Sequence, residues 1–176
     1  MSIEEAIREY GTDVLRICLM YLRDRTRAED AFQETFIRVH RHMETLMAAD
    51  SPKAWILRVA VNVCKDMLKG FWWRKVMTSG ALESSQRTAA GSNPEDTVIA
   101  RLEGQTRKQA VTEAVSKLPG RFRDVVILYY FQDQDTARIA ETLRLPEGTV
   151  RSRLHRARKL LQDHLKGWKD RNEPGN

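Results

Sequence analysis

Basic and hydroxyl side chains gather in one short stretch near the C-terminal end of the chain. Arginine donates paired hydrogen bonds to guanine in the DNA major groove, and short hydroxyls contact the edges of several bases. Side chains further along such a helix more often meet phosphate, which fixes position without reading sequence. The stretch therefore predicts base contacts by Thr149, Arg151, Ser152, His155 and Arg156, and phosphate contacts by Arg158 and Lys159.

The helix that must present these residues is predicted from its apolar spacing. Pro146 suits a first helical position. An apolar stripe follows at i, i+4, i+7, i+11 and i+15, formed by Val150, Leu154, Ala157, Leu161 and Leu165. At about 100° per residue, the opposite face carries Ser152, His155, Arg156 and Lys159.

A short helix over residues 135–143 is predicted just before the basic one. Asp135 or Thr136 caps it, while Ile139, Ala140 and Leu143 face inward. A tight turn at residues 144–145 then leads into the basic helix, which is the helix-turn-helix arrangement of DNA-binding proteins. An ordinary helical hairpin with a solvated basic face is the alternative, but the cap, small-residue and turn positions all favour DNA binding.

Charge and composition narrow the classes of function. The 176 residues carry a net charge of +6, and residues 107–176 alone hold 15 Lys and Arg against nine Asp and Glu. Such an excess is expected where phosphates are neutralised. No apolar run is long enough to cross a membrane and the N-terminus is acidic, so we expect a cytoplasmic protein without membrane insertion.

The cysteines and histidines predict no metal site. Cys18 and Cys64 each lie in an apolar helical pattern without CxxC spacing, so we interpret them as small core residues of a reduced protein. His40 and His42, two residues apart on a helix, face in different directions and form no ligand set with Cys64. We therefore expect neither a metal nor a cofactor.

Helical patterns also dominate the N-terminal half. Ser2–Glu5 and Thr26–Glu29 have the spacing of capping boxes, and Ser51–Pro52 provides an N-cap followed by proline. These starts predict three helices, of which the second runs to about Met47 and the third ends in residues 70–75.

The composition changes after residue 75. Residues 78–93 are rich in small and polar side chains, which predicts a flexible linker, and helix resumes at Asn93 and again at Leu118 through Phe131. The fold is therefore predicted to be all-α, with two small helical domains (residues 1–75 and 94–171) joined by a flexible linker (residues 76–93). Because the linker cannot bury a core, the domains are expected to move independently.

Four stretches match one known pattern in order and spacing. They read DAFQETF at residues 30–36, AWILRVAVNVCKD at 54–66, LPGRFRDVVIL at 118–128 and PEGTVRSRLHRAR at 146–158. Together they resemble a bacterial RNA polymerase sigma factor of the extracytoplasmic-function (ECF) type, the minimal two-domain form of the sigma-70 family. In that family the first stretch grips the clamp of core RNA polymerase, the second reads the −10 promoter element, and the last two belong to the domain that reads the −35 element.

The resemblance implies a promoter-specificity subunit, not an enzyme, whose partners are core RNA polymerase, promoter DNA and an anti-sigma factor, with no small-molecule substrate. The polar face around residues 30–36 predicts core contacts by Asp30, Gln33, Glu34 and Phe36. Promoter opening requires an extruded base, which needs a polar pocket beside a cationic rail. The −10 candidates are Ser51, Lys53, Arg58, Asn62, Lys65 and Lys69.

The chain departs from the family pattern in two places. Arg144 stands where the family usually has Gly in the turn, and a left-handed non-Gly residue there costs about 1 kcal/mol. A dense arginine run usually follows the −10 helix, and here Gly70–Lys75 replaces most of it. Trp72 and Trp73 within it either pack against a neighbouring helix or stack on unpaired bases.

Two other functions compete with this interpretation. A helix-turn-helix transcriptional regulator that is not a polymerase subunit explains the C-terminal half equally well, but leaves residues 30–36 and 54–66 unexplained. A helical enzyme such as a nuclease would need paired carboxylates, a nucleophile set or a phosphate loop. Asp30 and Glu34, one helical turn apart, are the pair that comes closest to such a site. An acidic face that is solvated or binds protein is much commoner than a metal site of this kind.

Overall fold

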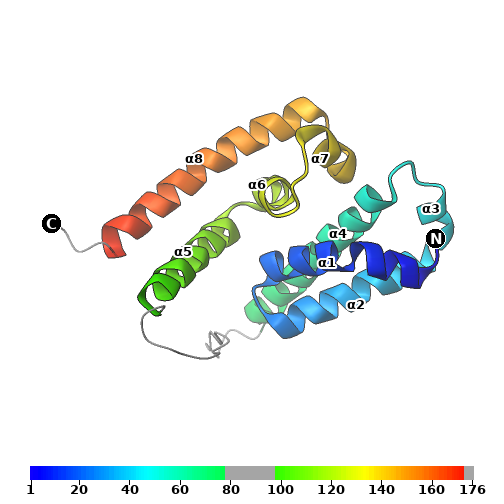
Figure 1. Cartoon of the computed structure of the whole chain (residues 1–176), viewed down its shortest axis with the longest axis horizontal. Coiled ribbons are helices and arrows are strands. Elements are labelled where there is room, and N and C mark those ends of the chain that lie inside the picture. Colours follow the sequence, from blue (N-terminus) through cyan, green and yellow to red (C-terminus); the bar gives the residue numbers. More distant parts are fainter. Residues whose placement is uncertain (78–97, 173–176) are drawn as a thin grey trace.

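The computed structural model describes residues 1–77 and 98–172, with side chains described for residues 1–70 and 108–166. These residues form helices joined by short turns and fall into two groups, one at each end of the chain (Figure 1). The described residues therefore confirm the all-α prediction.

The N-terminal domain contains α1 (Ile3–Leu22), α2 (Arg25–Arg41), α3 (Met43–Met47) and α4 (Pro52–Met77). The three long helices α1, α2 and α4 pack against one another in pairs. The predicted capping box of α1 is present, because Ser2 and Glu5 each accept a hydrogen bond from the other's backbone N–H. Ser51 accepts a hydrogen bond from the Ala54 N–H at 3.3 Å, as expected of the N-cap of α4.

The second helix differs from its predicted form at both ends. Its N-cap is Asp24, whose carboxylate accepts from the Arg27 N–H at 2.8 Å, so the predicted capping box Thr26–Glu29 is wrong. Aspartate caps a helix at least as well as threonine, and Asp24 comes earlier in the chain. The backbone leaves the helix at His42, and the continuation that was predicted to reach Met47 is the separate helix α3.

The C-terminal domain contains α5 (Val98–Lys117), α6 (Gly120–Val126), the π-helical turn η1 (Ile127–Phe131), α7 (Thr136–Leu143) and α8 (Glu147–Asn172). The single helix predicted to end at Phe131 is thus divided into α6 and a wider turn with i→i+5 hydrogen bonds. Asp135 caps α7 by accepting from the Arg138 N–H at 2.8 Å. Arg144 ends α7 in the left-handed conformation, with φ 53° and ψ 51°.

Most of the predicted linker lies outside the described residues. Residues 76 and 77 continue α4, and the helix predicted to restart at Asn93 is described only from Val98 onward. The side chains of Trp72 and Trp73 also lie outside the described set.

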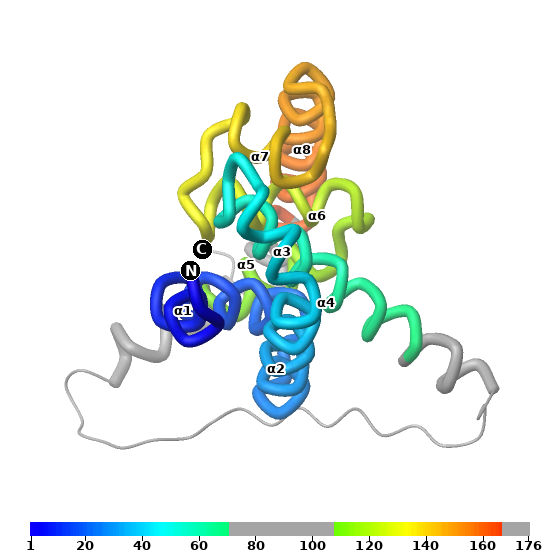
Figure 2. Tube along the Cα trace, turned by 90° about the vertical axis from the view of Figure 1, so that its right-hand side faces the viewer, coloured from blue at the N-terminus to red at the C-terminus, as the bar shows by residue number. Residues whose placement is uncertain are grey.

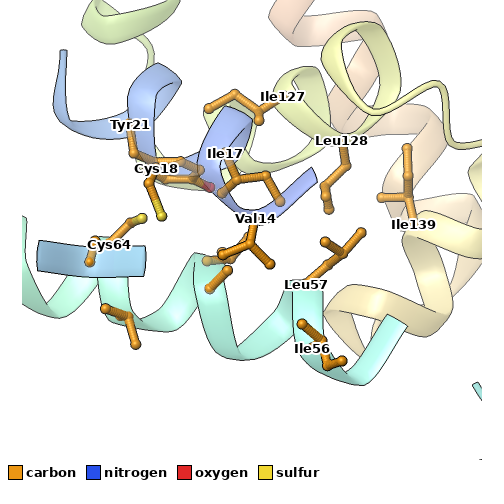
Figure 3. Packing of buried hydrophobic residues seen from close by; sticks show 14 of the residues in the cluster. Val14, Ile17, Cys18, Tyr21, Ile56, Leu57, Cys64, Ile127, Leu128 and Ile139 are labelled. Carbon is orange, nitrogen blue, oxygen red and sulfur yellow. The ribbon is translucent and has the colours of Figure 1, made fainter. Parts of the chain in front are cut away.

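The two domains pack against each other, which corrects the expectation that they move independently. Helices α1 and α4 both contact the C-terminal domain, α1 at η1 and α5 and α4 at α7, while α2 lies on the side away from α7 and α8 (Figure 2). Leu128 and Ile139 of the C-terminal domain point toward Leu57 of α4, and Ile127 lies next to Ile17 of α1 (Figure 3). All five side chains are fully buried. The sequence predicted correctly that Ile139 is buried, but could not reveal that it faces the other domain.

Candidate nucleic-acid interface

Helix α8 presents the predicted polar face to solvent. Ser152, His155, Arg156 and Lys159 are all exposed. On the opposite side Val150, Leu154 and Ala157 are at most 2% exposed, and Leu161 and Leu165 are half-buried. The apolar stripe therefore packs into the domain, where α8 contacts α5, α6 and α7, and the orientation of the helix matches its prediction.

Glu147 joins the two helices of the helix-turn-helix at the start of α8. It accepts hydrogen bonds from the Thr136 hydroxyl at 2.5 Å and from the Arg151 guanidinium at 2.7 Å. These two contacts lower the pKa of Glu147, the contact with Thr136 more strongly. Arg151 is thereby held beside the first turn of α8, where Ser152 donates to the Thr149 carbonyl at 3.0 Å. The base-reading candidates thus surround the N-terminus of the exposed helix.

Arg158 is held by two aromatic side chains that the sequence analysis did not assign to the site. Its Nε donates to the Tyr130 hydroxyl at 2.8 Å, and its guanidinium lies 5.5 Å from the ring centre of Tyr129. Both tyrosines belong to η1, and the hydrogen bond from Arg158 to Tyr130 raises the pKa of Arg158. The guanidinium therefore has a fixed position beside the polar face.

The −10 candidates lie on α4 and the loop before it, and two of them contact the C-terminal domain directly. Arg58 donates to the carbonyl oxygens of Thr142 at 2.6 Å and Glu141 at 2.8 Å, at the C-terminal end of α7. Lys65 donates to the Asp124 carboxylate at 2.8 Å. Burial, followed by the like charge of Arg144, lowers the pKa of Arg58.

The other −10 candidates differ in their surroundings. Lys53 pairs with Asp13 of α1 at 2.8 Å. Lys53 and Ser51 line an open cavity of about 610 Å³ between the domains, whose opposite wall includes Gln132 and Glu141. Asn62 and Lys69 are exposed. The structure thus brings Arg58, Asn62, Lys65 and Lys69 onto one stripe of α4, at positions 4, 3 and 4 residues apart.

Asp124 is the buried centre of the contact between the domains. The residue is 3% exposed, and its carboxylate accepts hydrogen bonds from the Tyr21 hydroxyl of α1 and the Lys65 ammonium of α4. Burial, and then the charge of Asp124, raises the pKa of Tyr21 well above its usual value. The sequence analysis assigned neither residue to a contact between the domains, although an aspartate among the apolar residues 122–128 was a visible signal.

The candidate polymerase face on α2 is only partly a surface. Asp30 and Gln33 are exposed, whereas Glu34 is half-buried and accepts from Arg38 at 2.7 Å. Phe36 is 5% exposed, and its ring centre lies 4.9 Å from that of Phe32. The structure therefore places Phe36 in the core beneath the polar face and not on the face itself.

The described side chains offer no constellation for metal chemistry, since none of them form a group of three or more His, Cys, Asp or Glu residues able to hold an ion. Cys18 and Cys64 are buried, unpaired by a disulfide, and face each other between α1 and α4 (Figure 3). No helix within the described ranges combines the length and apolar character of a membrane span.

Comparison with known proteins assigns both domains. Residues 6–74 match the family model for sigma-70 region 2, and residues 108–161 match the model for sigma-70 region 4. The chain is 30% identical over 163 residues to the ECF RNA polymerase sigma factor SigW of Bacillus subtilis, covering 89% of this chain and 85% of SigW. It is also 30% identical over 155 residues to SigL of Mycobacterium tuberculosis, covering 88% and 83% of the two chains.

Solved structures have the same fold. The sigma factor RpoE of Bartonella quintana, in complex with the anti-sigma factor NepR, superposes with a TM-score of 0.70 at 20% identity, over 93% of this chain and 96% of RpoE. CnrH, in complex with the cytosolic domain of CnrY, gives a TM-score of 0.64 at 20% identity, over 94% and 88%. With both domains matched in order and over nearly the whole chain, this protein belongs to the ECF subfamily of the sigma-70 RNA polymerase sigma factors, which bind core polymerase and direct promoter-specific initiation.

Proposed function

We propose that the two domains divide promoter recognition between them. The exposed first turns of α8 read the −35 element through Arg151, Ser152, His155 and Arg156, with Thr149 beside them, while Arg158 and Lys159 contact phosphate. The stripe on α4 and the preceding loop, with Ser51, Lys53, Arg58, Asn62, Lys65 and Lys69, binds and opens the −10 element. The observation that carries this proposal is the exposed polar face at the start of α8, because Val150, Leu154 and Ala157 on its opposite side are buried in packing.

Core polymerase binds the polar face of α2 in this proposal, through Asp30, Gln33 and Glu34. Phe36 supports that face from below. In this proposal the protein binds polymerase and DNA and performs no catalytic step itself. It acts in the cytoplasm, where RNA polymerase is found. An anti-sigma factor is a further proposed partner, since RpoE, which shares the fold, was solved in complex with the anti-sigma factor NepR.

Transcription in a reconstituted system tests the proposal. Core RNA polymerase is incubated with genomic DNA of the source organism, with and without the protein, and the 5′ ends of the transcripts are sequenced. We expect a new set of start sites that share two sequence elements upstream. A protein that changes only the amounts of transcripts made by a holoenzyme containing another sigma factor, and does not bind core polymerase, would instead be a helix-turn-helix regulator.

A further inference from the structure

Two neighbouring tyrosines of η1 contact a single arginine of α8. The Arg158 Nε donates to the Tyr130 hydroxyl, and the guanidinium lies 5.5 Å from the ring centre of Tyr129 and 5.9 Å from that of Tyr130. The two rings meet edge to face, with their centres 4.9 Å apart. These contacts restrain the guanidinium, so it loses less side-chain freedom when it binds a ligand.

The bond between Arg158 and Tyr130 leaves hydrogen-bond donors on both side chains. Arginine has donors and no acceptor, so the tyrosine oxygen must be the acceptor in this bond. Its own O–H can therefore donate to another group, and none of the described residues accepts from it. The terminal nitrogens of Arg158 likewise have no acceptor among the described residues. Because Tyr130 is 48% exposed and Arg158 is also exposed, a ligand can reach the pair.

The pair lies on a flank of α8 that also carries residues proposed to read bases. Arg151, His155 and Arg158 are four and three residues apart and form one exposed stripe along the helix. Arg151 is bonded to Glu147, which also accepts from Thr136 at the start of α7. The stripe therefore runs along the side of α8 that adjoins η1 and the start of α7. In a helix-turn-helix the first helix crosses the DNA backbone, so this side of the second helix lies toward the backbone.

A phosphodiester group matches the donors that the pair offers. It carries one negative charge and only accepts hydrogen bonds. Contacts to phosphate in protein–DNA complexes come both from arginine and from hydroxyl groups, including that of tyrosine. One phosphate can thus accept from the guanidinium and from the neighbouring hydroxyl together.

We propose that Tyr130 is a further DNA-contacting residue, which binds one phosphate of the −35 element together with Arg158. The hydroxyl and the terminal guanidinium nitrogens each donate to that phosphate, while the ring of Tyr129 supports the guanidinium. This inference rests on the proposed assignment of α8 to the −35 element. It adds to that assignment a neutral donor from η1, which precedes the helix-turn-helix.

The two side chains should contribute to DNA binding in different ways. Arg158→Ala removes a charge and should lower the slope of log affinity against log salt concentration by about 0.9, because one fewer counterion is released. Tyr130→Phe keeps the ring and removes only a neutral donor, so the slope should stay nearly unchanged. Loss of a hydrogen bond to a charged group should lower affinity about tenfold, alike for all base variants.

The test uses the polymerase holoenzyme and a promoter duplex identified by the transcript mapping. One phosphate of the −35 element at a time is replaced by an uncharged methylphosphonate, and binding is measured for the wild-type protein, Tyr130→Phe and Arg158→Ala. Tyr10→Phe, which removes a tyrosine hydroxyl from the N-terminal domain, is the matched control. We expect one linkage at which the wild-type protein and Tyr10→Phe lose affinity, and at which both other variants lose less.

Each outcome decides the proposal. Reduced sensitivity of Tyr130→Phe and Arg158→Ala at the same linkage, with the salt slope lowered only for Arg158→Ala, supports it. A wild-type pattern for Tyr130→Phe, or reduced sensitivity at a different linkage from Arg158→Ala, overturns it. Should Tyr130→Phe lose helical content, Tyr130→Leu takes its place under the same criteria. A wild-type protein without any sensitive linkage in the −35 element would remove the assignment of α8 itself, and this inference with it.

Discussion

The polar side chains of α8 divide by their distance from the start of the helix. Arg156 shares the outward face with Ser152, near the end that we propose enters the major groove, while Lys159 lies almost one turn further along. Losing a base-reading arginine costs about 1–3 kcal/mol and relaxes preference at one base pair, whereas losing a phosphate-binding lysine weakens all sequences alike. Substitution of the two residues is therefore expected to have different effects on DNA binding.

We expect Arg156→Ala to flatten discrimination among single-base variants of the −35 element, and Lys159→Ala to lower the salt dependence of binding without changing preference. The measurement is the affinity of the polymerase holoenzyme for a panel of DNA variants at two salt concentrations. An even loss of affinity across the panel for Arg156→Ala would identify Arg156 as a backbone contact.

Arg144 destabilises the folded protein in two ways, through its backbone conformation and through its charge. It is left-handed at the end of α7, and its charge opposes that of Arg58 across the contact between the domains. We expect Arg144→Gly to raise the free energy of unfolding by about 0.5–1 kcal/mol, because relief of strain exceeds the greater unfolded-state entropy of glycine. Urea denaturation measures the change.

Arg23→Gly is the comparison for this prediction. Arg23 is also left-handed, at the end of α1, with φ 55°, but it donates a hydrogen bond to Ser116 of the C-terminal domain at 3.1 Å. Glycine there relieves strain and also removes a favourable contact, so its gain should be smaller. An equal or larger gain at Arg23 would show that repulsion between Arg144 and Arg58 contributes nothing.

At the scale of elements, the faces of helices were predictable and their ends less so. The apolar stripe of α8 and the N-cap at Asp135 could be predicted, because both follow from the spacing of neighbouring residues in the sequence. The end of α2 at Arg41 and the π-helical turn η1 do not, because the apolar spacing continues through both positions. Local spacing also could not predict that two tyrosines of η1 contact Arg158.

Helix α2 offers a matched pair of charge reversals. Glu34 and Glu29 each pair with an arginine one turn away, at 2.7 Å and 2.9 Å, but lie on different sides of the helix. We expect Glu34→Lys to weaken binding to core polymerase and Glu29→Lys to leave it nearly unchanged. Surface ion pairs contribute about 0–1 kcal/mol, so both variants should remain folded.

Core binding is measured by competition with a labelled wild-type protein, and circular dichroism confirms folding. Equal affinities for the two variants would remove the assignment of this face to polymerase, since both substitutions reverse the same charge but at different positions around α2.

For the whole molecule, the division into two domains was predictable but their packing was not. Lys65 and Asp124 are 59 residues apart in sequence, and nothing in the pattern around either one points to the other. The sequence also suggested that Lys65 binds DNA, because promoter opening needs a row of cations beside the extruded base. Only the three-dimensional arrangement shows that the same lysine has an internal partner.

Alkaline pH should loosen this packing. The pKa of Tyr21 is raised well above its usual value in the folded protein by burial and then by Asp124. Below about pH 10 tyrosine is neutral in both states, so its contribution to stability is fully present there. Above that pH the unfolded chain binds fewer protons than the folded one, and the free energy of unfolding falls as pH rises.

Tyr21→Phe should therefore make stability depend less steeply on pH between about pH 10 and 11, the range just above the unfolded-state pKa. The measurement is the urea midpoint at several pH values. Tyr10→Phe is the comparison, because the pKa of Tyr10 is also raised, to about 12, but far from Asp124. Only Tyr21→Phe should also change the scattering profile of the free protein; a change with Tyr10→Phe alone would contradict this.

The two cations of α4 are held in chemically different ways, and this has an evolutionary consequence. Arg58 bonds to backbone carbonyls, which every residue type provides at positions 141 and 142, whereas Lys65 bonds to the side chain of Asp124. Among related proteins, substitutions at 65 and 124 should therefore covary, while residues 141 and 142 should drift without any correlated change at 58. An alignment of related proteins would then reveal the contact between Lys65 and Asp124 as a covarying pair, but would not reveal the contact that Arg58 makes with the backbone.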